Sequence, residues 1–359
     1  MRPFLPSKPG GGSGSSGKRR SKSTDPPLIQ VAEIQDMRNY WGRRLPRPIP
    51  AGLLRAAIRR HLAQPANLLL GSLSRLSDQP VSPAELAAIK VTLFQEGDFQ
   101  HIFRVAVRRR AGGQVQLAMV VAKDGFKISR MARRELANLQ HLYRRDERFV
   151  VRPLSGGMLA VDPAGPPARA RVFVYFTQWL AGMHELGVDR RMNFYINEIP
   201  LHTFRPAVSD TIRAQMLSIL FGYWDPVSRT VPEPPQIASG DFVISRPQAG
   251  KPLRLRLIAC RKIVSSVSLA RCLRLFLGYQ GQWAGNVFHL LPKDPRLLFE
   301  ALHRGLVEIN GGTIAWEQVE RELNVYAAEL QRPAVEMQAW TPLPALRKLI
   351  GALHHLKNR

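Results

Sequence analysis

Cysteine and long apolar runs are scarce in this sequence. Only Cys260 and Cys272 occur among 359 residues, and their spacing matches no metal-binding motif. Two free thiols suit a reducing compartment, so the sequence predicts a cytoplasmic protein. No stretch of about 18 apolar residues is present, so no transmembrane helix is expected. The first residues also lack the apolar core of a secretory signal peptide.

Acidic residues are scarce as well. The chain holds 27 Asp and Glu against 52 Lys and Arg, which gives a formal net charge of +25. A charge of this size implies an anionic partner, which could be a nucleotide, a nucleic acid, an acidic protein or a membrane surface. Arginine suits bidentate contacts with phosphate. A GC-rich coding sequence would also favour arginine, so the charge alone leaves the partner open.

The chain divides by composition into a tail, an extension and a larger remainder. Its length and its hydrophobic content of 45% suffice for two domains. Residues 1–27 are rich in glycine, serine, proline and basic side chains, which predicts a disordered basic tail. Residues 28–90 have the pattern of a helical extension, with helices at Gly52–Leu62 and about Pro65–Leu76. Residues 331–359 are expected to hold a C-terminal helix.

The stretch after residue 90 carries the clearest pattern. Gly112-Gly113 is a hairpin signal between two β-like runs. Apolar residues recur at helical spacing from about Ile128 to Arg145. Ser155–Gly157 has the composition of a turn. The expected strands are Val91–Gln95, His101–Arg110, Gln114–Ala122, Met158–Val161 and Arg171–Leu180.

Two charged residues in this stretch fall on apolar faces. Lys123 ends an apolar strand and, with a period of two, shares the face of Met119 and Val121. Glu135 lies four residues from both Met131 and Leu139, on the apolar stripe of the expected helix. A buried charge is costly alone, and two opposite charges that meet in one core partly compensate each other. We therefore expect Lys123 and Glu135 to lie within salt-bridge reach. The alternative is that both side chains extend from the edges of the core into solvent.

Val121-Ala122-Lys123 and Glu135 together resemble the strand lysine and helix glutamate of the protein-kinase-like superfamily, which includes the aminoglycoside phosphotransferases. Gly97 stands alone where that family has a glycine-rich loop. The resemblance implies an α+β fold with two lobes: an antiparallel-sheet small lobe at 91–180 and a mainly helical large lobe at 181–330. It also implies ATP as cofactor, with Gln178 in the hinge that bonds adenine. Helix-period segments expected in the large lobe are Asp210–Tyr223, Leu269–Leu277, Asp294–Leu306 and Trp316–Leu330.

Gly240-Asp241 before a strand resembles the catalytic loop of the phosphotransferase branch. The resemblance makes Asp241 the catalytic residue that positions the acceptor hydroxyl. The family's metal-binding asparagine would fall at Arg246, and its metal-binding aspartate near Cys260-Arg261. None of these is a hard oxygen donor, so the sequence argues against Mg²⁺. Arg246 is instead expected to face phosphate in the place of the cation. The alternative role of Asp241 is that of a turn residue before a strand.

Two functions remain open at this point. The first is a kinase-like, degenerate protein that binds a nucleotide or a phosphorylated ligand between its lobes through Lys123, Glu135 and Asp241. The second is a basic module for nucleic acid or another anionic surface, without a nucleotide site. It rests on the net charge and on Arg108-Arg109-Arg110, and salt-dependent binding to random duplex would support it.

Overall fold

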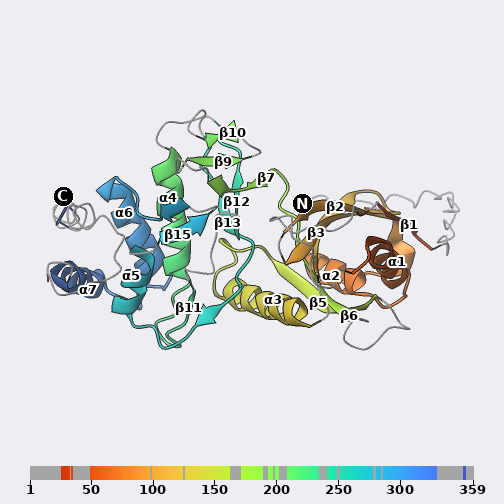
Figure 1. Ribbon diagram of the computed structural model, residues 1–359, viewed down its shortest axis with the longest axis horizontal. Coiled ribbons are helices and arrows are strands. Elements are labelled where there is room, and N and C mark those ends of the chain that lie inside the picture. Colours follow the sequence, from red (N-terminus) through yellow and green to blue (C-terminus); the bar gives the residue numbers. More distant parts are fainter. Residues whose placement is uncertain are drawn as a thin grey trace, which may run out of the picture.

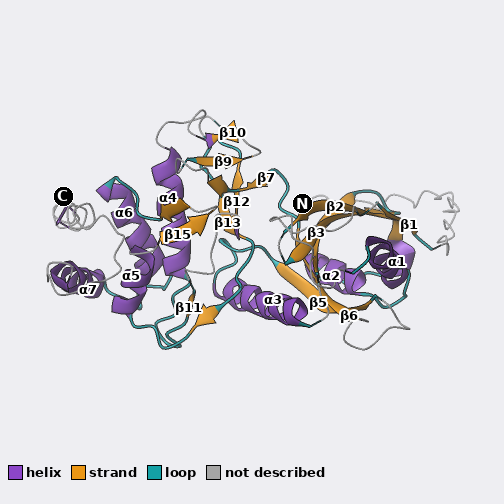
Figure 2. Ribbon diagram, viewed as in Figure 1, coloured by secondary structure: helices purple, strands orange, loops and turns teal. Residues whose placement is uncertain are grey.

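The computed structural model describes residues 26–32, 34, 49–97, 99–123, 126–161, 171–188, 193–196, 199–201, 208–233, 241–248, 251–277, 280–283, 286–329 and 351–352. The predicted tail and C-terminal helix lie outside these residues, apart from 26–27 and 351–352. The α+β class is confirmed. A large sheet gathers at one end of the molecule and helices α4–α7 at the other, with α3 between them (Figures 1 and 2). No helix in this part of the chain is long and apolar enough to cross a bilayer.

The main sheet has six strands in the order β1-β2-β3-β4-β6-β5. The strands from β2 to β6 pair antiparallel, as predicted for the sheet at 91–180. The first strand, β1, comes from the extension and pairs parallel to β2, so the six-stranded sheet as a whole is mixed. The extension therefore contributes a strand that was not predicted, besides helices at about the two predicted places. Gly112 and Gly113 have φ of 95° and 82°, which fits the predicted hairpin turn. The strands are β1 (Leu28–Val31), β2 (Leu86–Glu96), β3 (Gln100–Arg109), β4 (Gln114–Ala122), β5 (Pro153–Ala160) and β6 (Arg171–Gln178).

Helices cover both faces of this sheet. On one face, α1 (Ala51–Leu62) and α2 (Leu68–Ser77) share one hydrophobic core with alternate residues of β4, including Met119 and Val121. On the other face, α3 (Lys127–Arg145) packs against Val120 and Ala122. Successive strand residues point to opposite faces, so each polar side chain at the end of β4 belongs to one of these two cores.

Gly156 and Gly157 lie inside β5, and the turn predicted at Ser155–Gly157 was wrong. A Cβ at Gly156 would stand 2.5 Å from the Leu136 side chain of α3. On the opposite face, a Cβ at Gly157 would stand 3.1 Å from Leu68 of α2. These glycines are needed because helices approach the strand closely on both faces, and not because the backbone turns.

The rest of the chain is mainly helical and carries several short strands. The helices are α4 (Val208–Gly222), α5 (Leu269–Leu277), α6 (Pro295–Leu302) and α7 (Trp316–Glu329), with a π-helix at His303–Glu308 and a 3₁₀ turn at Pro83–Glu85. The short strands are β7 (Met183–Glu185), β8 (Gly187–Val188), β9 (Phe194–Ile196), β10 (Ile199–Pro200), β11 (Val231–Pro232), β12 (Phe242–Ser245), β13 (Leu255–Leu257), β14 (Ile263–Val264), β15 (Gln280–Trp283) and β16 (Asn286–His289). Strands β13, β12 and β7 form a small antiparallel sheet beside α3.

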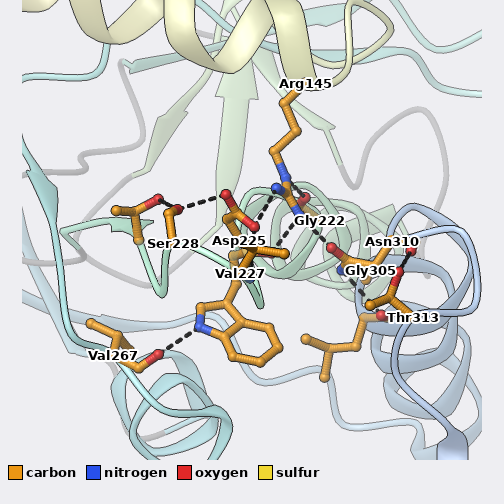
Figure 3. Close-up of polar contacts among 12 residues, drawn as sticks. Arg145, Gly222, Asp225, Val227, Ser228, Val267, Gly305, Asn310 and Thr313 are labelled. Carbon is orange, nitrogen blue, oxygen red and sulfur yellow. Dashed lines mark hydrogen bonds and ion pairs between the residues drawn. The ribbon is translucent and has the colours of Figure 1, made fainter.

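Arg145, in the last turn of α3, ties the sheet-bearing part to the helical part (Figure 3). Its guanidinium donates to the carbonyl oxygens of Gly222 at 3.0 Å and Trp224 at 2.7 Å, at the end of α4. It also donates to the Asn310 side chain and lies 3.3 Å from the Asp225 carboxylate. One side chain thus satisfies carbonyls that a helix end leaves without intrahelical partners.

Arg145→Ala is expected to lower the free energy of unfolding by about 2–3 kcal/mol, because several charge-assisted hydrogen bonds are lost together. Arg144→Ala is the matched control, since Arg144 is exposed on the same helix turn. Urea denaturation of both variants measures the difference. Equal stability of the two variants would show that the Arg145 contacts do not hold the two parts together.

Candidate functional site

Lys123 and Glu135 do not form the predicted pair. Both side chains are buried, with exposed fractions of 1% and 2%. The Lys123 Nζ lies 2.8 Å from the Glu96 Oε1 instead. His101 pairs with Val121 and with Glu96 in the sheet register, so these residues share the face covered by α1 and α2. Side chains alternate between the two faces of the sheet, and α3 covers the face opposite to that of Lys123. The same alternation that buries Lys123 therefore separates it from Glu135.

Glu135 has other partners on the α3 side of the sheet. Gln100, which pairs with Ala122 across the β3–β4 ladder, donates from its Nε2 to the Glu135 Oε2 at 2.5 Å. The Tyr175 hydroxyl also hydrogen-bonds this carboxylate. Burial raises the pKa of Glu135, while the nearby Arg261 charge and the Gln100 hydrogen bond oppose that rise. Glu135 is therefore bonded by neutral donors, and the charge of Arg261 lies nearby.

Asp241 lies at the start of β12, buried at 3% exposure, and its partner is Arg261. The Arg261 Nη1 stands 2.7 Å from the Asp241 Oδ2. Asn138, one turn along α3 from Glu135, donates to the Cys260 carbonyl at 2.9 Å and so fixes the segment that carries Arg261. Burial opposes the charge of Arg261, but the Asp241 carboxylate outweighs it and raises the guanidinium pKa. This ion pair joins the two ends of the β12–β13 hairpin.

Glu185 of β7 completes the polar group at this junction. The Gln95 side chain of β2 donates to the Glu185 Oε2 at 2.5 Å. Burial raises the pKa of Glu185, and the Asp241 charge adds to the rise. We give the name junction cluster to the residues that make these contacts: Gln95, Gln100, Glu135, Glu185, Asp241 and Arg261. Both glutamines come from the tip of the β2–β3 hairpin, which therefore closes over the carboxylates.

Gly97 lies in the short connection between β2 and β3. The Gly97 amide donates to the Gln100 carbonyl at 2.9 Å, and strand pairing continues to Glu96 and His101. A phosphate cradle uses free backbone amides, and the Gly97 amide is already bonded within the hairpin. At the tip of the hairpin, the Phe99 carbonyl accepts a hydrogen bond from the Lys123 amide at 3.0 Å.

Gln178, the predicted hinge residue, is the last residue of β6. Its amide donates to the Arg152 carbonyl at 3.0 Å, and the Trp179 amide donates to the Gln116 carbonyl at 3.4 Å. The backbone donors predicted to bond adenine are thus used within the protein. A base that bound here would have to displace sheet hydrogen bonds.

Arg246 is exposed and follows the last residue of β12. Four residues at about 3.3 Å each separate it from Phe242 by roughly 13 Å. The backbone of Arg246 therefore lies well along the strand from Asp241, and Arg261 is the cation that pairs with the Asp241 carboxylate. Of the arginines at the β3–β4 turn, Arg108 and Arg110 are exposed while Arg109 is half-buried, as alternation along a strand requires.

The residues around Asp241 do not fit Mg²⁺. The cation prefers oxygen ligands in an octahedral arrangement, and a guanidinium beside the carboxylate competes for the same charge. Burial, together with the Glu135 and Asp241 charges, raises the pKa of Cys260 to about 12, which keeps the thiol protonated. Within the part of the chain that is described, no three His, Cys, Asp or Glu side chains form a metal-binding group.

Sequence reasoning missed Glu185, Gln95 and Gln100, and it treated Arg261 only as a lost ligand. Glu185 lies in a segment of weak periodicity, and the two glutamines flank a turn where polar residues are common. The available signal was Arg261 itself, a cation four residues after β13, the strand that pairs with β12. In comparisons with known proteins, no family model and no curated sequence matches this chain.

Proposed function

We propose that this protein is a non-catalytic, kinase-like binding protein in which its own side chains fill the site between the two lobes. The observation that carries the proposal is the Arg261 guanidinium on the Asp241 carboxylate, 2.7 Å apart. Arg261 stands where the family resemblance places a metal-binding aspartate. The pair neutralises the carboxylate that would otherwise position an acceptor hydroxyl.

Three further contacts support this proposal. Lys123, the residue expected to orient phosphates, is paired with Glu96 on the opposite face of the sheet. Gln95 and Gln100 bond Glu185 and Glu135, so the hairpin tip holds the cluster closed. Buried carboxylates in this cluster also repel an incoming phosphate. Phosphoryl transfer depends on positioning and on charge stabilisation by metal ions, and this arrangement supplies neither.

We also propose that the protein works in the cytoplasm on an anionic partner. Cys260 and Cys272 are both free and buried, which suits a reducing compartment. The excess of basic residues attracts anions to the surface as a whole. The protein would then recruit a ligand by charge and shape, and would not modify it.

A thermal-shift titration with ATP, with and without Mg²⁺, tests the proposal. A ligand at one hundred times its Kd adds about 2.7 kcal/mol of stability, so even a weak site would raise Tm. We expect no saturable rise for the wild type or for Lys123→Met, with the exposed-lysine variant Lys90→Met as control. A saturable, Mg²⁺-dependent rise that disappears in Asp241→Asn would contradict the proposal.

A further inference from the structure

A cavity of about 220 Å³ lies apart from the junction cluster, between α4, β13 and the π-helix. We call it the arginine cavity, because four of its lining residues are Arg148, Arg254, Arg256 and Arg304. They come from three separate segments of the chain. Arg254 immediately precedes β13, and Arg256 lies within it. Because side chains alternate along a strand, the two arginines point to the same side. None of the junction-cluster residues lines this cavity.

Most of this positive charge is not neutralised by carboxylates. Arg148 is committed to Asp146, with its Nη2 2.8 Å from the Oδ2. Arg256 donates to the Glu147 carbonyl at 2.5 Å, which satisfies one N–H but leaves its charge. Among the described residues, Arg254 and Arg304 form no ion pair. Three arginines that line the cavity thus have no ion-pair partner among the described residues; Arg256 is half-buried, and Arg254 and Arg304 are exposed.

The cavity also holds a hydroxyl donor and an apolar surface. Ser218 of α4 is buried, and its Oγ has no hydrogen-bond partner among the described residues. By contrast, the Ser72 hydroxyl bonds the carbonyl four residues back in its own helix, at 2.8 Å. The guanidinium groups of Arg148 and Arg304 lie over the Phe149 ring, 5.3 and 5.2 Å from its centroid. A ligand here would meet cations, a free hydroxyl and an aromatic face.

We propose that the arginine cavity binds a small phosphate monoester. The phosphate would accept hydrogen bonds from Arg254, Arg256, Arg304 and the Ser218 hydroxyl, since planar guanidinium groups match phosphate oxygens in bidentate geometry. The organic substituent would lie against Phe149. A cavity of about 220 Å³ is smaller than the roughly 300–1,000 Å³ of pockets for drug-sized ligands, which limits that substituent to a small group.

Isothermal titration calorimetry with inorganic phosphate and with phenyl phosphate, at constant ionic strength in chloride, tests this site. We expect saturable binding of both, with phenyl phosphate tighter because it reaches Phe149. Arg254→Gln and Arg304→Gln should each weaken binding about tenfold or more, as loss of a charge-assisted hydrogen bond does. Ser218→Ala should weaken binding without lowering the unfolding midpoint, since its hydroxyl has no partner to lose. Arg271→Gln, at an exposed position on α5, is the matched control and should bind as the wild type does.

Two outcomes would overturn the proposal. The first is the absence of saturable binding by the folded wild type. The second is equal weakening in Arg271→Gln and in the cavity variants, which would show attraction to the overall charge alone. Because these residues lie outside the junction cluster, the result is independent of whether the protein binds ATP.

Discussion

Replacing Arg261 with methionine is expected to lower the free energy of unfolding by about 3–5 kcal/mol, the usual cost of leaving a buried charge unpaired. Methionine retains much of the apolar part of the arginine side chain, so the loss of stability reports on the missing charge. Two buried carboxylates depend on this cation: Asp241 through the ion pair, and Glu135 through its electrostatic field. Arg271→Met, at an exposed position, should change stability by less than about 0.5 kcal/mol.

The Arg261→Met deficit should grow as pH rises. Burial already raises the pKa of Glu135 above 4.5 in the native protein, and removing Arg261 takes away its largest opposing influence. A carboxyl whose folded pKa exceeds its unfolded value favours folding below the unfolded pKa and loses that advantage as pH rises through the folded value. The deficit should therefore be smallest near pH 4.5 and largest at neutral pH. A deficit that stays constant over this range would mean that packing, and not charge, explains the loss.

Glu96→Gln is expected to cost about 3 kcal/mol, because it leaves the Lys123 ammonium buried without a carboxylate. The Lys123 side chain has 0% exposure while Glu96 retains 28%, so the two partners are not equivalent. Lys123→Met should change stability by less than about 1 kcal/mol, since Glu96 can turn to solvent and methionine fills the same space. The Glu96→Gln/Lys123→Met double variant should recover most of the loss.

Chemical denaturation of the three variants measures this asymmetry. Tolerance of Glu96→Gln combined with a large loss in Lys123→Met would indicate that Lys123 has another anionic partner. The same variants separate a structural lysine from a phosphate-binding one. If Lys123 oriented phosphates, Glu96→Gln would increase the affinity for ATP by releasing its ammonium, and we expect no such increase.

Periodicity predicted most elements of the fold because local pattern and packing agree there. The strand Gln114–Ala122 was predicted with its observed bounds, and the helix from Ile128 begins one residue earlier in the structure. Gly156 misled the prediction because a glycine needed for close packing has the same signature as a glycine needed for a turn. Parallel pairing of β1 could not be predicted, since its partner residues lie 60 positions further along the chain.

The candidate site was harder to predict because it depends on which face each element covers. Period two assigned Lys123 to the face of Val121, and burial at that position is confirmed. No local signal told which face α3 would cover, so Glu135 was assigned the wrong partner. The Arg261–Asp241 pair depends on the register of the β12–β13 hairpin, in which Phe242 pairs with Leu257. That register brings together residues that lie just outside the two strands. The spacing of residues in the sequence does not reveal the register.

A double-mutant cycle of Asp241→Asn and Arg261→Met tests the central claim most directly. If the pair replaces a catalytic centre as an internal structural contact, both single variants lose stability and the coupling energy is about 2 kcal/mol or more. Catalytic residues behave differently, since their removal often leaves stability unchanged or raises it. Additivity within about 0.5 kcal/mol, or an increase in stability in Asp241→Asn, would contradict the account.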